Sequence, residues 1–248
     1  MNQENIQAPV ALITGAGRRI GAAIATHLHS AGYRVIIHCL HSIAAAEELA
    51  SKLNQVRSRS AMTIQADLSD PHVSSLITDS IHWAGRLDLL VNNASIFKRN
   101  EINIYNATDC LQTFNINVFA PLCLSQAAYP YLAETKGVII NITDIHAHKP
   151  LKQYSVYCQS KAALTMQTFS LAREFAPLVR VNAIAPGAIV WPEHSNSLTD
   201  EQQQQIIDQT PLRQHGDPCF IAQAVLTLAT NQFITGEILR VDGGRSLS

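Results

Sequence analysis

The sequence lacks an excess of charge of either sign. Its 248 residues include 18 Lys and Arg against 19 Asp and Glu, a formal net charge of −1. A protein that binds nucleic acid or an anionic membrane through charge usually carries a basic excess. The composition therefore supports neither kind of partner. At this length, one domain over residues 1–248 with a large core is the simplest organisation.

Long apolar runs and a secretory signal are also missing. No apolar run approaches the ~20 residues that cross a bilayer, and residues 1–8 lack a basic stretch followed by an apolar core. The cysteines are odd in number, widely spaced and free of C-x-x-C, which favours reduced thiols over disulfides or a zinc site. They are Cys39, Cys110, Cys123, Cys158 and Cys219. We expect a soluble, cytoplasmic protein without a bound metal.

Short apolar runs alternate with helical patterns along the chain. Such alternation predicts right-handed β-α-β crossovers and a parallel sheet, and strands that are apolar throughout predict helices on both faces. The expected class is therefore α/β, a Rossmann-type doubly wound parallel sheet of about seven strands. The predicted strands cover 10–14, 33–39, 61–66, 87–91, 137–142, 179–184 and 237–241, and the helical stretches include 107–132 and 155–175.

A glycine-rich turn follows the first predicted strand and opens a helical pattern. It reads Gly15-Ala16-Gly17-Arg18-Arg19-Ile20-Gly21, and its last glycine comes one residue later than in G-x-G-x-x-G. Glycines allow a phosphate close to the backbone, and the helix N-terminus attracts an anion. The pattern indicates a phosphate-binding turn. The alternative is a tight β-α turn without a chemical role.

The end of the second predicted strand lacks the acidic residue that an NAD-binding unit places there for the ribose 2′-hydroxyl. No Asp or Glu occurs between Arg18 and Glu47, and the strand ends in His38-Cys39-Leu40-His41-Ser42. This neutral-to-basic region can offer hydrogen bonds to a 2′-phosphate, which favours NADP over NAD. The alternative is that His38 and His41 are incidental surface residues.

Further polar residues follow later predicted strands, and ligands of doubly wound folds sit beyond these carboxyl ends. Asp67, followed by Leu68, could meet an adenine amino group. The polar stretch 188–199 could close over a substrate. The other strand ends carry Asn92-Asn93-Ala94-Ser95, Thr143-Asp144 and Pro186-Gly187.

Tyr157 and Lys161 are four residues apart in a predicted helix and therefore share one of its faces. A nearby cation lowers the pKa of a tyrosine, which makes the hydroxyl a usable proton donor near neutral pH. Taken alone, the pair also fits an ordinary amphipathic helix, so its meaning depends on the rest of the chain.

Several motifs in this order resemble the short-chain dehydrogenase/reductase family. They are Thr14-Gly15-x-x-x-x-x-Gly21, Asn92-Asn93-Ala94, Asn117, Tyr157-x-x-x-Lys161 and Pro186-Gly187. The resemblance implies that Tyr157 donates a proton, that Lys161 binds the nicotinamide ribose and lowers the pKa of Tyr157, and that Asn117 holds a water in the proton relay. It also implies a homotetramer built on helices 107–132 and 155–175. The implied cofactor contacts are Gly15, Arg18, Arg19, Ile20, His38, His41, Ser42, Asp67, Leu68, Asn93, Ala94, Ser95, Tyr157, Lys161, Pro186, Gly187 and Ile189.

At two positions the chain departs from the general family pattern and resembles the pteridine reductases instead. Arg19 stands where most members carry a third glycine, and Asp144 stands where most carry a serine. The resemblance implies that Asp144 takes part in proton delivery, that Arg19 and Ser95 contact pterin or cofactor, and that Phe97 stacks on the pterin. One difference remains, because parasite-type members place an Arg at the position of His41.

The chemistry agrees with this resemblance. Reduction of a pterin C=N bond needs a proton on nitrogen, which a carboxylic acid or a carboxylate–phenol pair can supply, and Phe97 offers a flat ring a stacking face. We expect NADPH-dependent reduction of dihydropterin, and of oxidised pterin or dihydrofolate, within folate metabolism. The alternatives are a carbonyl reductase acting on 3-oxoacyl thioesters and a non-catalytic cofactor sensor. For the residues themselves, Asp144 could be a helix N-cap and Phe97 a core residue.

Overall fold

The protein is described by a computed structural model over residues 8–101, 103–104, 106–193 and 196–248. Its centre is a seven-stranded sheet in the order β3-β2-β1-β4-β5-β6-β7, with every neighbouring pair parallel. This confirms the predicted doubly wound fold. The strands are β1 (Val10–Ile13), β2 (Arg34–Cys39), β3 (Ala61–Gln65), β4 (Leu89–Asn92), β5 (Val138–Ile142), β6 (Arg180–Pro186) and β7 (Ile238–Val241).

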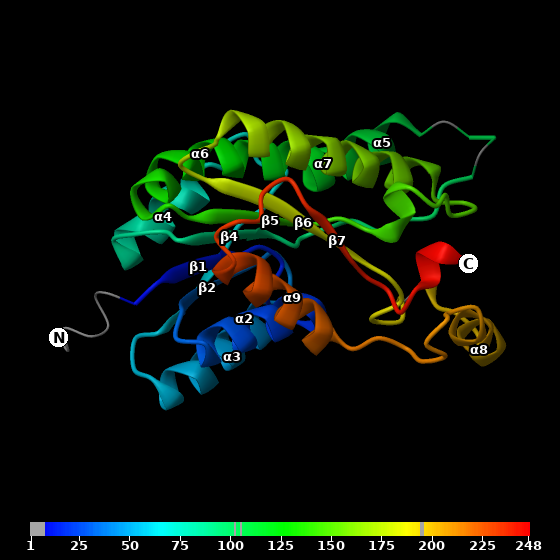
Figure 1. Cartoon of the computed structure of the whole chain (residues 1–248), viewed down its shortest axis with the longest axis horizontal. Coiled ribbons are helices and arrows are strands. Elements are labelled where there is room, and N and C mark those ends of the chain that lie inside the picture. Colours follow the sequence, from blue (N-terminus) through cyan, green and yellow to red (C-terminus); the bar gives the residue numbers. More distant parts are fainter. Residues whose placement is uncertain (1–7, 102, 105, 194–195) are drawn as a thin grey trace.

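Helices cover both faces of this sheet, as Figure 1 shows. The four residues of β1 are fully buried and alternate between two cores: Ala11 and Ile13 belong to one, Val10 and Leu12 to the other. One face carries α2 (Arg19–Ser30), α3 (Ile43–Val56) and α9 (Pro218–Thr230), and the other carries α4 (Ser75–Ala84), α6 (Ala120–Thr135) and α7 (Ser155–Glu174). The apolar strands thus reflect burial on both sides.

The predicted helix 107–132 is divided in the structure. It consists of α5 (Ala107–Phe114), a π-helical turn η1 (Asn115–Phe119) and α6. A π-turn accommodates an extra residue within a helical path and is frequent at functional sites. The predicted stretch is thus helical throughout, but the sequence pattern did not indicate the π-turn within it. The π-turn places Asn117 inside the protein, where it is 1 % exposed.

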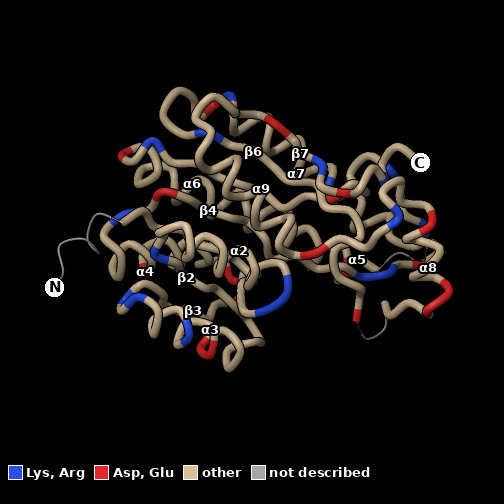
Figure 2. Tube along the Cα trace, turned by 60° about the horizontal axis from the view of Figure 1, so that its bottom comes forward, with Lys and Arg blue, Asp and Glu red and all other residues tan. Residues whose placement is uncertain are grey.

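Charges of both signs are mixed along the chain in Figure 2, in keeping with the net charge of −1. Among the described residues, no helix combines the length and the hydropathy that a membrane crossing needs. A small helix, α8 (Asp200–Asp208), follows the stretch after β6 and starts with a capping box between Thr199 and Gln202.

Candidate active site

The glycine turn follows the carboxyl end of β1, and the predicted site residues Asn93 and Asp144 follow the carboxyl ends of β4 and β5. The turn itself packs tightly on the segment after β4. Gly15 has a φ of +62°, and a Cβ there would lie 2.9 Å from the Cα of Ala94. The side chain of Asn93 donates to the carbonyls of Thr14 and Gly15, at 2.9 and 3.1 Å. Asn93 therefore holds the backbone of the turn in place through these two hydrogen bonds.

The N-terminus of α2 is left open to an anion. Arg18, its N-cap residue, makes no side-chain capping bond, and the first turn contains no acidic residue. The free N–H groups and the positive end of the helix dipole therefore lack a partner from the cap or the first turn. The side chain of Arg18 is 62 % exposed beside this end. These features fit a phosphate-bearing cofactor.

Arg19 occupies a backbone conformation that favours glycine. Its φ is +57°, in the left-handed region where a residue other than glycine is strained. Its guanidinium donates to the carbonyl of Trp191 at 2.9 Å and lies 3.5 Å from Glu193. Arg18 lies 3.5 Å from the same carboxylate. The two arginines thus tie the turn to the stretch after β6.

The ring of His38 is engaged within the protein, whereas the sequence suggested that it meets a 2′-phosphate. Its ring is 1 % exposed, Nδ1 accepts from the N–H of Gly15 at 3.1 Å, and Nε2 donates to the carbonyl of Ala66 at 3.1 Å. Burial lowers the pKa of His38, so the ring stays neutral. With both nitrogens in use, His38 supports the turn and cannot grip a 2′-phosphate. It is not an incidental surface residue either.

The remaining predicted residues of the adenosine side have mixed positions. His41 is exposed and Ser42 half-buried at the start of α3. Asp67 is exposed just after β3, and hydrogen bonds from the N–H and hydroxyl of Ser69 lower the pKa of its carboxyl. The side chain of Leu68 belongs to the core, so only its backbone can face a ligand.

The candidate catalytic centre is the pair formed by Tyr157 and Asp144. The tyrosine hydroxyl donates to Oδ2 of Asp144 at 2.6 Å. The other oxygen, Oδ1, accepts from the N–H of His146 and caps the short helix η2 (Ile145–Ala147). The carboxylate is therefore both the N-cap considered from the sequence and a partner of the tyrosine, and the cap holds it in place.

The protonation of this pair differs from the sequence-based expectation. Burial, and then the charge of Asp144, raises the pKa of Tyr157 well above that of an exposed tyrosine. Lys161 is 2 % exposed and donates to the carbonyl of Ile142 at 2.8 Å, with its ammonium 5.7 Å from the centre of the Tyr157 ring. Burial lowers the pKa of Lys161 to about 8. In this arrangement the Tyr157 hydroxyl is the donor of the pair, and burial and Asp144 are the main causes of its raised pKa.

Asn117 joins three parts of the site. Its Oδ1 accepts from the N–H of Ile96 at 2.8 Å and from the hydroxyl of Ser95 at 3.2 Å. Its Nδ2 donates to the carbonyl of Ile96 and to the hydroxyl of Ser160, both at 3.0 Å. The side chain thus fixes the segment after β4 against α7. The role of Asn117 in holding a water stays a prediction.

Phe97 lies against two tyrosines, Tyr154 at the N-cap of α7 and Tyr157 in its first turn. Its ring stacks on Tyr154, with centroids 4.3 Å apart and planes 12° from parallel, and meets Tyr157 edge-on at 4.8 Å. Sequence reasoning missed Tyr154. The available signal was its position three residues before Tyr157, on the same side of the helix.

The stretch after β6 passes over the glycine turn. Gly187 packs against Asp242, since a Cβ there would lie 2.8 Å from the Cα of Asp242, and Ile189 is 5 % exposed. The ring of Trp191 stacks on His215 at 4.1 Å. Residues 194 and 195 of the predicted closing stretch 188–199 lie outside the described residues.

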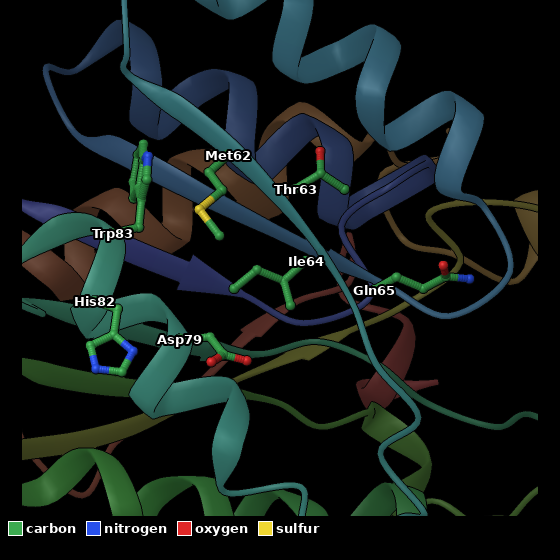
Figure 3. Close-up of a pocket in the computed structure, with 7 residues that line it drawn as sticks. All are labelled: Met62, Thr63, Ile64, Gln65, Asp79, His82 and Trp83. Carbon is green, nitrogen blue, oxygen red and sulfur yellow. The ribbon is translucent and has the colours of Figure 1, made fainter.

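A separate pocket of about 560 Å³ lies between β3 and α4 (Figure 3). Trp83 and the edge of β3 line it, and it contains none of the predicted site residues. In the described part of the chain, no group of three or more His, Cys, Asp or Glu side chains could hold a metal ion.

Comparison with known proteins places the chain in a family. A family model described as enoyl-(acyl carrier protein) reductase matches residues 15–246. Pteridine reductase 1 of Leishmania tarentolae is 33 % identical, with 97 % of each chain covered. The 3-oxoacyl-[acyl-carrier-protein] reductase FabG of Staphylococcus aureus is also 33 % identical, over 94 % of this chain and 96 % of that protein.

A solved structure supports the same assignment. FolM alternative dihydrofolate reductase 1 from Brucella suis, solved in complex with NADP, superimposes with a TM-score of 0.91. It is 32 % identical and covers 98 % of this chain and 96 % of its own. The fold, the motifs in the site and these relatives lead to one conclusion: the chain belongs to the short-chain dehydrogenase/reductase family of NAD(P)-dependent oxidoreductases.

Proposed function

We propose that this protein is an NADPH-dependent pteridine reductase that converts a dihydropterin to a tetrahydropterin and also accepts oxidised pterin or dihydrofolate. The observation that supports this most directly is the hydrogen bond of 2.6 Å from the Tyr157 hydroxyl to Oδ2 of Asp144, beside the ring of Phe97. A carboxylate in this position suits proton delivery to a ring nitrogen. The similarity to pteridine reductase 1 and to FolM supports this proposal.

The residues around the glycine turn fit NADPH. The open N-terminus of α2 would hold the pyrophosphate, and Arg18, His41 and Ser42 would contact the 2′-phosphate. When bound, NADPH supplies the hydride. Lys161 would bind the nicotinamide ribose, and the adenine and nicotinamide ends would meet Asp67, Leu68, Pro186, Gly187 and Ile189. The NADP complex of FolM supports the choice of cofactor.

The protein's own part in the reaction is to hold and deliver a proton. Because the pKa of Tyr157 is raised, its hydroxyl keeps its proton at neutral pH and donates a hydrogen bond to Asp144. A ring nitrogen beside this pair can take that proton as hydride reaches the neighbouring carbon. Phe97 would stack on the ring, and Arg19 and Ser95 would contact its polar edge. Lys161 keeps a positive charge near the pair below pH 8 or so.

A carbonyl reductase is the second candidate, because FabG is as similar in identity as pteridine reductase 1. Against it stands Asp144, since polarising a carbonyl oxygen needs donors, whereas the carboxylate here is an acceptor and engages the hydrogen bond of the Tyr157 hydroxyl. Loss of NADPH absorbance with dihydrobiopterin, dihydromonapterin, dihydrofolate and an acetoacetyl thioester in parallel separates the two. Turnover of the thioester alone would contradict our proposal, and turnover of none would favour a non-catalytic sensor.

We also propose that the protein is a homotetramer. Large apolar side chains are exposed on neighbouring elements of one side, α5, η1 and α7, which contact each other. Contiguous exposed apolar groups of this kind mark interaction surfaces. They are Leu111, Phe119, Met166 and Phe169, exposed by 41 to 61 %.

A further inference from the structure

A closed circuit of contacts joins Phe97, Tyr154 and Asn196, which come from three separate segments. The rings of Phe97 and Tyr154 are stacked at 4.3 Å. The hydroxyl of Tyr154 lies 3.1 Å from Oδ1 of Asn196, and Nδ2 of Asn196 donates to the carbonyl of Phe97 at 2.7 Å. Phe97 is thus held through both its ring and its backbone.

Arg99 fixes the direction of the hydrogen bonds in this circuit. Its Nε, which can only donate, lies 3.0 Å from the hydroxyl oxygen of Tyr154. The oxygen therefore accepts from Arg99, and the hydroxyl proton points to Oδ1 of Asn196. The amide of Asn196 is then oriented with its NH₂ group toward Phe97, so the direction of each hydrogen bond in the circuit is fixed.

Tyr154 has the burial expected of a supporting residue. It is 6 % exposed, while Phe97 is half-buried and Arg99 exposed. Tyr154 covers one face of the Phe97 ring at van der Waals distance and leaves its hydroxyl as the only polar group to be satisfied. A change at Asn196 would therefore affect Phe97 in two ways: through the Tyr154 ring that stacks on it, and through the hydrogen bond to the Phe97 carbonyl.

We propose that Asn196, acting through Tyr154, is a positioning residue that sets the plane of the Phe97 ring against a flat heteroaromatic substrate. The stretch after β6 then contributes to substrate choice although Asn196 itself need not touch the substrate. The chemical class of the substrate rests on the proposed function, whereas the circuit of contacts is independent of it.

The test measures equilibrium binding of oxidised biopterin, followed by pterin fluorescence, to protein saturated with NADP⁺. Asn196→Ala removes both hydrogen bonds, and Tyr154→Phe removes the hydroxyl but keeps the stacked ring. We expect Tyr154→Phe to weaken biopterin binding about fivefold, the effect of one lost hydrogen bond, and Asn196→Ala to weaken it at least as much. Because both act in one circuit, the double variant should lose no more than Asn196→Ala alone. NADP⁺ affinity should not change.

Two further variants sharpen the result. Asn196→Asp can still accept from Tyr154 but cannot donate to the carbonyl of Phe97, so it should bind biopterin as weakly as Asn196→Ala. Asn231→Ala is the matched control, because Asn231 is an exposed asparagine at the end of α9, away from the circuit. This control should bind biopterin like the unaltered protein.

The outcomes separate this inference from the proposed function. If the unaltered protein binds biopterin but reduces no pterin, the proposed function fails while the variants still test the circuit. Pterin reduction with full biopterin affinity in Asn196→Ala would overturn the inference alone. Additive losses in the double variant would overturn it too, and absence of biopterin binding in the unaltered protein would overturn both.

Discussion

The hydroxyl of Tyr157 donates to Asp144 across 2.6 Å, and the same carboxylate caps η2 through its second oxygen. The carboxylate of Asp144 is thereby held by the backbone that follows β5. A test of Asp144 must therefore distinguish the loss of proton delivery from the loss of the helix cap.

Asp144→Ala and Asp144→Ser should both lose pterin turnover by about a hundredfold or more, the contribution of a positioned acid or base. Serine is a good N-cap, so only the alanine variant should also lose stability, by about 1 kcal/mol. NADPH binding should persist in both. Steady-state assays and urea unfolding measure these effects, with the exposed Asp79→Ala on α4 as control. Undiminished turnover in either variant would remove Asp144 from the mechanism.

Lys161→Met should change how stability depends on pH in the cofactor-free protein. The pKa of Lys161 is about 8 in the folded protein against 10.5 for an exposed lysine, which corresponds to about 3 kcal/mol of cost for the buried charge. The cost is fully present below pH 8. It falls as pH rises toward 10.5, because the unfolded chain then binds more protons than the folded one.

Urea unfolding between pH 7 and 10 should therefore show the unaltered protein gaining stability relative to Lys161→Met as pH rises. The raised pKa of Tyr157 acts in the opposite direction only above about pH 10, where an exposed tyrosine ionises. Lys152→Met, at an exposed lysine, should show no such change. A stability difference that stays constant with pH would contradict the prediction.

Two glycines of the turn should differ in their tolerance of alanine. A Cβ at Gly21 would lie 2.4 Å from the carbonyl oxygen of Gly15, a backbone atom. A Cβ at Gly17 would meet the hydroxyl of Ser42 at 2.3 Å, and that side chain can rotate away. Gly21→Ala should cost about 1–3 kcal/mol of stability and weaken NADPH binding.

Gly17→Ala should cost less, and Ser42→Gly should relieve part of its effect. Urea unfolding and NADPH titration of the three proteins check the order. Equal losses in Gly17→Ala and Gly21→Ala would show that the turn shifts as a whole.

Arg18→Ala should lower the preference for NADPH over NADH about tenfold, because a charge-assisted hydrogen bond to the 2′-phosphate is lost. The ratio of kcat/KM for the two cofactors measures this directly. Arg173→Ala, at an exposed arginine near the end of α7, serves as control. An unchanged ratio would leave the 2′-phosphate to His41 and Ser42.

Light scattering after gel filtration should give a mass near four times the 27.1 kDa chain. Met166→Glu places a charge on the exposed face of α7 and should reduce that mass, because burying an unpaired charge is costly. Val56→Glu, at an exposed valine at the end of α3, should leave it unchanged. A monomeric mass for the unaltered protein would contradict the proposed homotetramer.

The strands could be predicted because the parallel sheet is buried on both faces, which leaves an apolar run such as 10–13 with little ambiguity. Asp144 and Tyr157 could be paired because a strand end and a helix start are fixed by the fold. His38 could not be placed, since its role depends on which groups its two nitrogens face. Asn196 and Tyr154 lie 42 residues apart and belong to no motif, so only the structure brings them together.

The π-turn at Asn115–Phe119 also has a consequence for chain length. Each residue of an α-helix rotates the following side chains by about 100°, so the extra residue in this turn sets the rotational phase of α6 relative to α5. Deleting one residue here would straighten the helix and swing Leu124 and Leu132 out of the core. Insertions and deletions should therefore be excluded from this segment.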